Sequence, residues 1–303
     1  MSTVIDLSGI PAPNVIEPLD YEQLLAERKA HLISMYPEDQ RAEIAAVLEL
    51  ESEPLTKALQ ENAYRELILR QRINEGAQAV MLPYAKDEDL DNLVAFEGVK
   101  RLLITPATPN AVPPTAAVYE SDTDLLRRYQ LALEAKSKGG TRDYYRYYAL
   151  TASGQVLDAD ALSPQPGYVV VPVLSRTDGG LPSQALLDQV QAAVTAEDVR
   201  ILTDYVTVQP ATLIDYSITA TLYFEPGPYT EVALSTARTA AADYAQERHR
   251  LGLEVSLSGI YRALHQPGVR RVDLASPVAD LIVQPAEASR CVSIELIDGG
   301  VHG

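Results

Sequence analysis

The sequence predicts an α+β protein in which an N-terminal helical segment precedes two small α/β sandwich-like domains with short, mainly antiparallel sheets. With 303 residues, the chain is long enough for two or three domains. Apolar residues recur at fourfold spacing from Leu55 to Leu67, which is typical of one face of a helix. Polar and apolar residues alternate from Ser217 to Leu222, which is typical of a strand with one covered face.

The composition indicates a globular protein with an acidic surface. Hydrophobic residues make up 47% of the chain and charged residues 22%, which are ordinary values for a folded domain. The formal net charge is −17. Because nucleic-acid binding needs clustered Lys and Arg, we expect no nucleic-acid partner. A negative surface is compatible with basic protein partners.

Neither redox chemistry nor a metal site is indicated by the cysteine and histidine content. Cys291 is the single cysteine, which excludes an internal disulfide, and none of the four histidines stands near a second likely ligand. We therefore expect no metal and no cofactor. The first twenty residues lack the basic and apolar regions of a secretory signal. No stretch approaches the roughly 20 apolar residues of a membrane span, so we expect none and expect synthesis in the cytoplasm.

The N-terminal third is predicted to be an extended arm followed by helices. Residues 1–19 contain three prolines and read as an arm that frays or lies along a neighbour. We assign residues 20–98 to a helical domain. Asp20 followed by Gln23 predicts a capped helix to about residue 36, and Pro37 interrupts it before a second helical stretch over 38–51.

A longer helix is predicted to follow, with Ser52 as its cap and Pro54 in its first turn. Beside its apolar stripe, Tyr64, Ile68 and Ile73 form a second apolar row. Such a helix either packs on the rest of the chain or completes a bundle with another subunit, and the residues alone leave both open. The candidate partner-helix residues are Leu48, in the preceding helical stretch, and six residues of these two rows: Leu55, Leu59, Ala63, Leu67, Tyr64 and Ile68.

The segment 99–118 is predicted to be a strand, over about 99–105, followed by a proline-rich linker. We place a domain boundary near residue 118. The first α+β domain then spans 119–210, with Ser121 and Thr141 each beginning a helix. Its elements are predicted as helices over 121–138, 141–151 and 182–195, and strands over 155–162, 168–175 and 204–210, with a proline-bearing loop at 163–166 and a turn at 177–180.

The second α+β domain is predicted over 211–303. Period-two alternation indicates its strands, and Glu225-Pro226-Gly227-Pro228 marks a break before its long helix. Its elements are predicted as strands over 214–224, 269–276, 279–283 and 291–298, and helices over 230–250 and 256–265.

No catalytic constellation is apparent in the sequence. Asp87, Asp89 and Asp91 alternate like the start of a calcium loop, but the template fails because Asn92 and Gly98 stand where Gly and Glu are required. We interpret them as a solvated acidic helix start. The four tyrosines that flank Arg146 are typical of packing or of a protein interface. Catalytic residues are therefore not assigned.

Several long phrases, taken in order, resemble the baseplate J-like family of contractile-tail bacteriophages and related phage-tail-like bacteriocins. They cover nearly the whole chain, and their specificity comes from length and order, since none is a catalytic motif. They include LELESEPLTKALQENAYRELILRQRINE at 48–75, ITPATPNAVPPTAAVYESDTD at 104–124 and VVVPVLSRTDGGLPSQALLDQVQAAV at 169–194.

The resemblance implies a non-enzymatic structural wedge protein, assembled in the host cytoplasm into the tail baseplate of a virion or bacteriocin. It implies a six-fold ring around the central hub that helps trigger sheath contraction. The implied partners are other copies of the chain, another wedge or tail protein held through the N-terminal helices, and hub and sheath-initiating proteins. Residues 211–303 would contact neighbours in the ring, and linkers near 83–88 and 105–116 would allow re-docking. A tail-associated cell-wall hydrolase is the alternative function.

Overall fold

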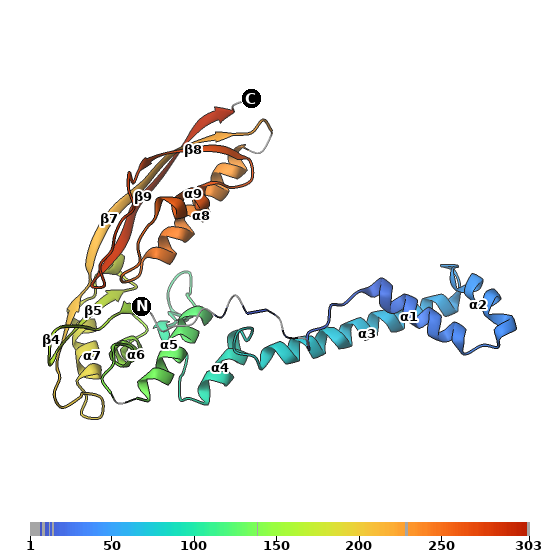
Figure 1. Cartoon of the computed structure of the whole chain (residues 1–303), viewed down its shortest axis with the longest axis horizontal. Coiled ribbons are helices and arrows are strands. Elements are labelled where there is room, and N and C mark those ends of the chain that lie inside the picture. Colours follow the sequence, from blue (N-terminus) through green and yellow to red (C-terminus); the bar gives the residue numbers. More distant parts are fainter. Residues whose placement is uncertain are drawn as a thin grey trace. The chain divides into compact units, whose positions relative to one another are not determined.

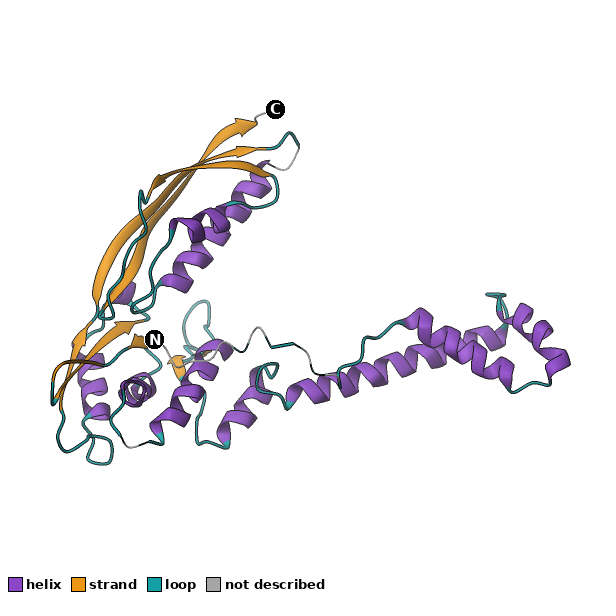
Figure 2. Ribbon diagram, in the orientation of Figure 1, coloured by secondary structure: helices purple, strands orange, loops and turns teal. Residues whose placement is uncertain are grey.

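The computed structural model describes residues 15–137, 139–227 and 230–301, together with Leu7, Ile10, Pro11 and Pro13. Much of the expected N-terminal arm therefore lies outside the described residues. The chain divides into two compact units, a helical one over Ile5–Gly98 and a mixed one from Val99 onward. Figure 2 shows the helices and strands of each unit. The predicted α+β class is confirmed.

The helical unit contains α1 (Tyr21–Ser34), η1 (Glu38–Gln40), α2 (Arg41–Leu48), α3 (Pro54–Ala79) and α4 (Asp87–Ala95) (Figure 1). The predicted cap of α1 is confirmed, because the Asp20 carboxylate accepts hydrogen bonds from the backbone N–H groups of Glu22 and Gln23. The predicted cap at Ser52 is wrong. Glu53 occupies that position without a side-chain bond, and Pro54 begins the helix where a missing N–H has no cost.

A small apolar core joins α1, α2 and α3. Its buried residues come from all three helices: Leu24, Leu25, Leu48, Leu59 and Ala63. Thr56 lies at its edge, where its hydroxyl donates a hydrogen bond of 3.2 Å to the carbonyl of Leu48 at the end of α2. That bond satisfies one of the carbonyls that a helix end leaves without a partner.

The described part of the N-terminal arm runs beside α3. The Asn74 side chain accepts a hydrogen bond of 3.2 Å from the Glu17 backbone N–H and donates one of 2.9 Å to the Glu17 carbonyl. Tyr84 donates its hydroxyl to the Ile10 carbonyl at 2.8 Å. Hydrogen bonds between side chains of the helical unit and the backbone of the arm therefore hold this stretch in place.

The mixed unit begins with a two-stranded ribbon of β1 (Leu103–Thr105) and β2 (Val118–Tyr119), which pair antiparallel. The predicted strand over 99–105 is therefore too long. Its first residues are held by side chains instead, since Glu120 accepts the backbone N–H of Leu102 and Arg128 donates to the Lys100 carbonyl.

The first α+β region surrounds a sheet with β5 at its centre. Its helices are α5 (Asp122–Ala135), α6 (Arg142–Ala152) and α7 (Gln184–Val194), with the short turn η2 (Asp178–Gly180). Its strands are β3 (Val156–Ala159), β4 (Leu162–Gln165), β5 (Tyr168–Ser175) and β6 (Tyr205–Pro210). Strands β3 and β4 pair antiparallel with β5, whereas β6 pairs parallel with it. The cap predicted at Ser121 and the helix start predicted at Thr141 are confirmed, and Thr141 also caps its helix.

One loop prediction in this region is wrong. The proline-bearing loop over 163–166 overlaps strand β4, which pairs with β5 at Leu162 and Gln165. Pro164 is tolerated because β4 lies at the edge of the sheet, where a missing N–H breaks no ladder bond.

The second α+β region is a three-stranded sheet covered by two helices on one face (Figure 1). Its elements are β7 (Thr212–Phe224), α8 (Thr230–Arg248), α9 (Leu257–Leu264), β8 (Val269–Ser276) and β9 (Glu287–Val301). Strand β7 is central, antiparallel to β8 and parallel to β9. Every second residue from Tyr216 to Phe224 is buried against the helices, which confirms the alternation expected from the sequence.

The strand predicted over 279–283 is wrong. Leu281 makes only an isolated bridge to Val255, while Val278 and Ile282 are exposed. A side chain holds this segment in place of a ladder: the Asp280 carboxylate accepts the Leu257 backbone N–H at 2.7 Å, at the start of α9.

Candidate assembly surfaces and a buried polar network

The seven candidate partner-helix residues divide between the interior and the surface of the helical unit. Leu48, Leu59 and Ala63 are buried in the core of their own unit, and Leu55 and Leu67 pack against that core, half-buried. The remaining two residues are open to solvent: the exposed fraction of Tyr64 is 57% and that of Ile68 is 47%.

Ile73, which was expected in one row with Tyr64 and Ile68, belongs instead to a separate exposed apolar row that continues to the C-cap of α3. Leu69 and Ile73 on α3 are 64% and 65% exposed, and Val80 at its C-cap is 69% exposed. With about 100° of rotation per residue, this row and the pair Tyr64 and Ile68 lie on opposite sides of the buried stripe. We call these the two flanks of α3. The sequence did not lead us to predict Leu69 and Val80 as exposed apolar residues. They stand four and seven residues from Ile73, and this helical spacing was a usable signal.

Ion pairs connect α3 to its neighbours inside the helical unit. Glu66 accepts hydrogen bonds from Arg28 on α1 and from Arg70 one turn later. Arg70 also reaches Glu17 at 3.0 Å. The hydrogen bonds from Arg28 and Arg70 lower the pKa of Glu66. Exposed pairs of this kind contribute little stability, so the apolar core carries the packing of the unit.

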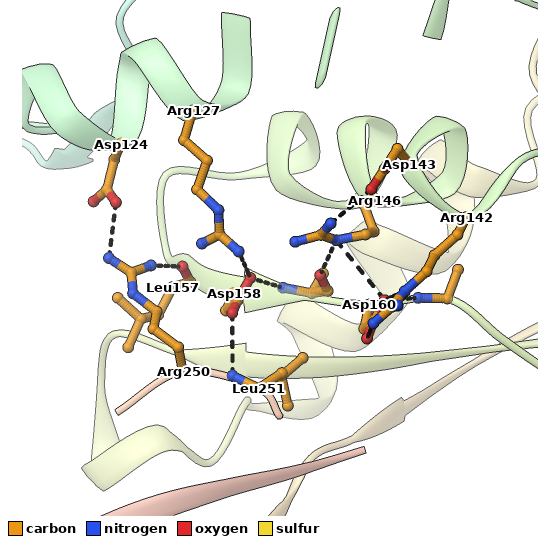
Figure 3. A network of polar contacts seen from close by, with 12 residues as sticks. Asp124, Arg127, Arg142, Asp143, Arg146, Leu157, Asp158, Asp160, Arg250 and Leu251 are labelled. Atoms are coloured by element: carbon orange, nitrogen blue, oxygen red, sulfur yellow. Dashed lines mark hydrogen bonds and ion pairs between the residues drawn. The ribbon is translucent and has the colours of Figure 1, made fainter. Parts of the chain in front are cut away.

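A buried polar network joins the two α+β regions of the mixed unit, as Figure 3 shows. Arg250, just after α8, donates one hydrogen bond of 2.8 Å to Asp124 on α5 and another to the carbonyl of Leu157 on β3. The backbone N–H of Leu251 donates to the Asp158 carboxylate at 3.1 Å. Two consecutive residues of the second region are therefore anchored to the first.

The carboxylates that receive these bonds are held by further arginines of the first region. Arg176 donates to Asp124 at 2.7 Å, and Arg127 on α5 donates to Asp158 at 3.0 Å. The Asp158 side chain is 2% exposed. Burying a carboxylate costs free energy unless it is paired and hydrogen-bonded, and each of these carboxylates has at least two donors.

The network continues along α6 through a second pair of acidic groups. Arg142 makes a two-pronged ion pair with Asp160, and Arg146 donates to Asp143 at 2.6 Å and to the Ala159 carbonyl at 3.2 Å. The hydrogen bond with Asp160 raises the pKa of Arg142. Fork-shaped arginine pairs of this type fix geometry as well as charge.

Opposing effects act on the Asp124 carboxyl. Burial raises its pKa, but the charge of Arg250 and the hydrogen bond from Arg176 outweigh burial and leave the pKa below the ordinary value. Asp124 is therefore ionised at neutral pH and holds both arginines. The arrangement joins the two regions through charge-assisted hydrogen bonds.

The other residues singled out in the sequence lie apart from this network. Asp87, Asp89 and Asp91 open helix α4, as expected for an acidic helix start. Tyr144 and Tyr145 are buried in contact with each other at right angles, which confirms the packing interpretation for these two. Within the described part of the chain, no three metal-binding side chains come together. None of its helices is long and apolar enough to cross a membrane.

Residues 51–108 match the family model of the Baseplate J-like N-terminal domain, and residues 137–210 match that of the Baseplate J-like central domain. The chain is 50% identical over 297 residues to "Baseplate protein J" of Escherichia phage P2, and the match covers 98% of each chain. A solved structure, the six-fold symmetrised cryo-EM baseplate of the anti-feeding prophage, matches at 15% identity and a TM-score of 0.39, over 60% of this chain and 43% of that one.

Proposed function

Because the chain belongs to the baseplate J-like family, we propose that this baseplate protein is a structural wedge subunit of a contractile tail. In this proposal, several copies surround the central hub in a six-fold ring that helps trigger sheath contraction. The observation that carries it is the near full-length 50% identity to a phage baseplate protein. The two units supply its parts: a helical unit for lateral bundling and a mixed unit for the ring.

Helix α3 is the proposed bundling element. Its core-facing stripe is occupied by α1 and α2, so Leu48, Leu59 and Ala63 stabilise the unit itself. The contact with partners then falls on the two flanks, of which Tyr64 and Ile68 were among the predicted residues. Apolar rows exposed on a helix favour partner helices. Two flanks allow two neighbours, which fits a bundle of two copies of this chain and one companion tail protein.

Residues 211–303 form the proposed ring contact. The second α+β region is held to the first by Arg250 and Leu251, so the mixed unit would move as one block. The segments near 83–88 and 105–116 would then absorb any rearrangement, because most of their residues, 83–86 and 106–116, lie outside the helices and strands. Bistable re-docking of rigid blocks is a common way to transmit a switch. Hub and sheath-initiating proteins are the proposed partners on either side of the ring.

A double substitution on the flank formed by Tyr64 and Ile68 tests the bundling role of α3. Tyr64→Ser with Ile68→Ser removes exposed apolar groups, so the isolated protein should keep its thermal stability. We expect the variant to be missing from tail particles purified from cells that supply it in place of the natural chain. Leu69→Ser with Ile73→Ser tests the other flank in the same way. Normal incorporation and normal infectivity of both variants would overturn the proposal.

A structural rather than enzymatic role is part of the same proposal. The buried carboxylates of the mixed unit are committed to arginines. Purified protein is expected to leave peptidoglycan intact in a zymogram. A cleared band that disappears on substitution of a single carboxylate would favour the alternative of a tail-associated cell-wall hydrolase.

A further inference from the structure

A groove of 590 Å³ lies in the second α+β region between the C-terminal half of α8 and strand β9. Five consecutive residues of β9, from Arg290 to Ile294, form one wall. Arg238, Gln246 and His249 belong to the opposite side. Since a strand rises about 3.3 Å per residue, the groove follows the strand over the length of a short extended peptide.

The wall formed by β9 is the free edge of the sheet. On the side away from β7, Ala288 makes a bridge to Leu251, and beyond Ala288 no backbone partner is found among the described residues. The register of β9 also shifts beside Tyr216, where Val292 is bulged out of the ladder and 59% exposed. Long edges with apolar residues pair readily with another chain unless something covers them. Bulges at such edges often mark functional positions.

The groove has a basic character within an acidic protein. The whole chain has 42 acidic residues against 25 Lys and Arg, yet no Asp or Glu is among the described residues that line this groove. Arg290 is balanced by Asp215, with both bonds at 2.7 Å. Arg238 is exposed and forms no ion pair with any described residue. Its charge is therefore available to an acidic group in the groove.

We propose that this groove binds an extended acidic segment of a partner protein, added as a strand to the free edge of β9. Main-chain hydrogen bonds along the edge would provide affinity, as in other cases of strand addition. Alternate side chains of an added strand point to the same face. A carboxylate on the α8 face would meet Arg238, while small groups would rest on Ala242 and Val292. An elongated groove of this kind suits a peptide better than a small anion.

Fluorescence anisotropy with the full-length protein tests this directly. The probe is a labelled heptapeptide of alternating Thr and Glu. Two control peptides carry either Gln in place of every Glu, or N-methyl groups on the alternate amides that would face β9. We expect saturable binding of the acidic probe, and weaker binding of both controls by about tenfold or more, which corresponds to about 1.4 kcal/mol.

Variants of the protein separate charge from shape. Arg238→Glu should lower the affinity for the acidic probe by about tenfold or more. The control Arg262→Glu makes the same charge change at an exposed position on α9, outside the groove, and should bind like the natural chain. Ala242→Trp fills the groove without a charge change and should also abolish binding. Circular dichroism should show both groove variants folded.

Several outcomes would overturn the inference. These are the absence of probe binding at millimolar concentration, equal binding of the Gln or N-methylated peptide, or equal effects of Arg238→Glu and Arg262→Glu. Competition by free glutamate at the same concentration as the peptide would assign the groove to a small anion instead. The flanks of α3 are not involved in this assay, so its failure and the failure of the wedge proposal are distinguishable.

Discussion

At the scale of single residues, buried polar groups in the mixed unit are placed by specific partners. Tyr144 donates its hydroxyl to the Val199 carbonyl at 2.6 Å, and Tyr145 donates to the Asp204 carboxylate at 2.7 Å. Burial raises the pKa of Tyr144 to about 12. Both rings thus fill the core while their hydroxyl groups are satisfied, which is the usual requirement for a buried tyrosine.

Asp124→Asn is expected to destabilise the mixed unit by about 2 kcal/mol at neutral pH, because it leaves two partly buried arginines without their counter-charge. The folded-state pKa of Asp124 is lowered, so its contribution is complete above the unfolded-state pKa of about 4 and is lost as the pH falls through the folded value. Urea unfolding at several pH values measures both effects.

The acid dependence provides the check on this prediction. The natural chain should lose stability progressively as the pH falls below about 5, and Asp124→Asn should lose less over the same range. Asp273→Asn is the matched control: Asp273 also pairs with an arginine, Arg271, but the pair is exposed and screened by solvent, so this variant should keep nearly the acid dependence of the natural chain. An equal acid dependence in the natural chain and in Asp124→Asn would contradict the assignment.

Substitution of two helical glycines by alanine is expected to change the stability of the protein in opposite directions. Gly76 on α3 has open space around it, so Gly76→Ala should stabilise the helical unit by about 0.5–1 kcal/mol. At Gly259 on α9, a Cβ would lie 2.3 Å from the Tyr244 hydroxyl oxygen. That ring is fixed by hydrogen bonds to the backbone of Ser256, so Gly259→Ala should destabilise by about 1 kcal/mol or more. Differential scanning calorimetry of the two variants decides the signs.

At the scale of elements, α3 carries on one helix both the stripe that packs inside the chain and the two flanks proposed to contact partners. Its buried stripe and its two exposed flanks differ by rotation about the axis, not by position along the chain. A substitution on the stripe should therefore act on stability, and one on a flank should act on assembly.

Leu59→Ala is expected to reduce the free energy of unfolding of the helical unit by about 3 kcal/mol, because it leaves a cavity between α1 and α3. Leu69→Ala, on an exposed flank of the same helix, should change it by about 0.5 kcal/mol or less. Chemical denaturation followed by circular dichroism compares the two. Similar losses for both variants would mean that the exposed flank is packed within the chain.

At the scale of the whole molecule, the chain consists of two units with separate cores. The helical unit closes around Leu48 and its neighbours. The mixed unit contains a core in each α+β region and, between them, a small apolar cluster of Leu174, Ala211 and Ala288 beside the bonds of Arg250 and Leu251. Separate cores agree with the proposal above that each unit contacts a different partner.

This division predicts two unfolding transitions in calorimetry, since independent units unfold independently. Leu59→Ala should lower the midpoint of one transition, and Tyr144→Ala, which removes a buried ring from the other unit, should lower the other. Hydrogen exchange assigns each transition to its segment. If either variant shifted both midpoints equally, the two units would have to unfold as one.

The local structure of this protein was largely determined by its sequence. Asp20 and Ser121 cap their helices as expected, and a helix begins at Thr141 as expected, because a helix start depends on residues at most three positions away. The alternation in β7 predicted its buried face for the same reason. The family resemblance was equally readable, since it depends on the order of residues alone.

Only the tertiary structure decided which distant segments meet. The parallel pairing of β7 with β9, and the bond from Arg250 to Asp124 across 126 positions, depend on contacts that no local pattern encodes. The same holds for α3, where α1 and α2 cover the stripe first assigned to partner helices and leave its flanks open. A periodic pattern identifies an apolar face, but the partner that buries it is chosen by the packing of the whole chain.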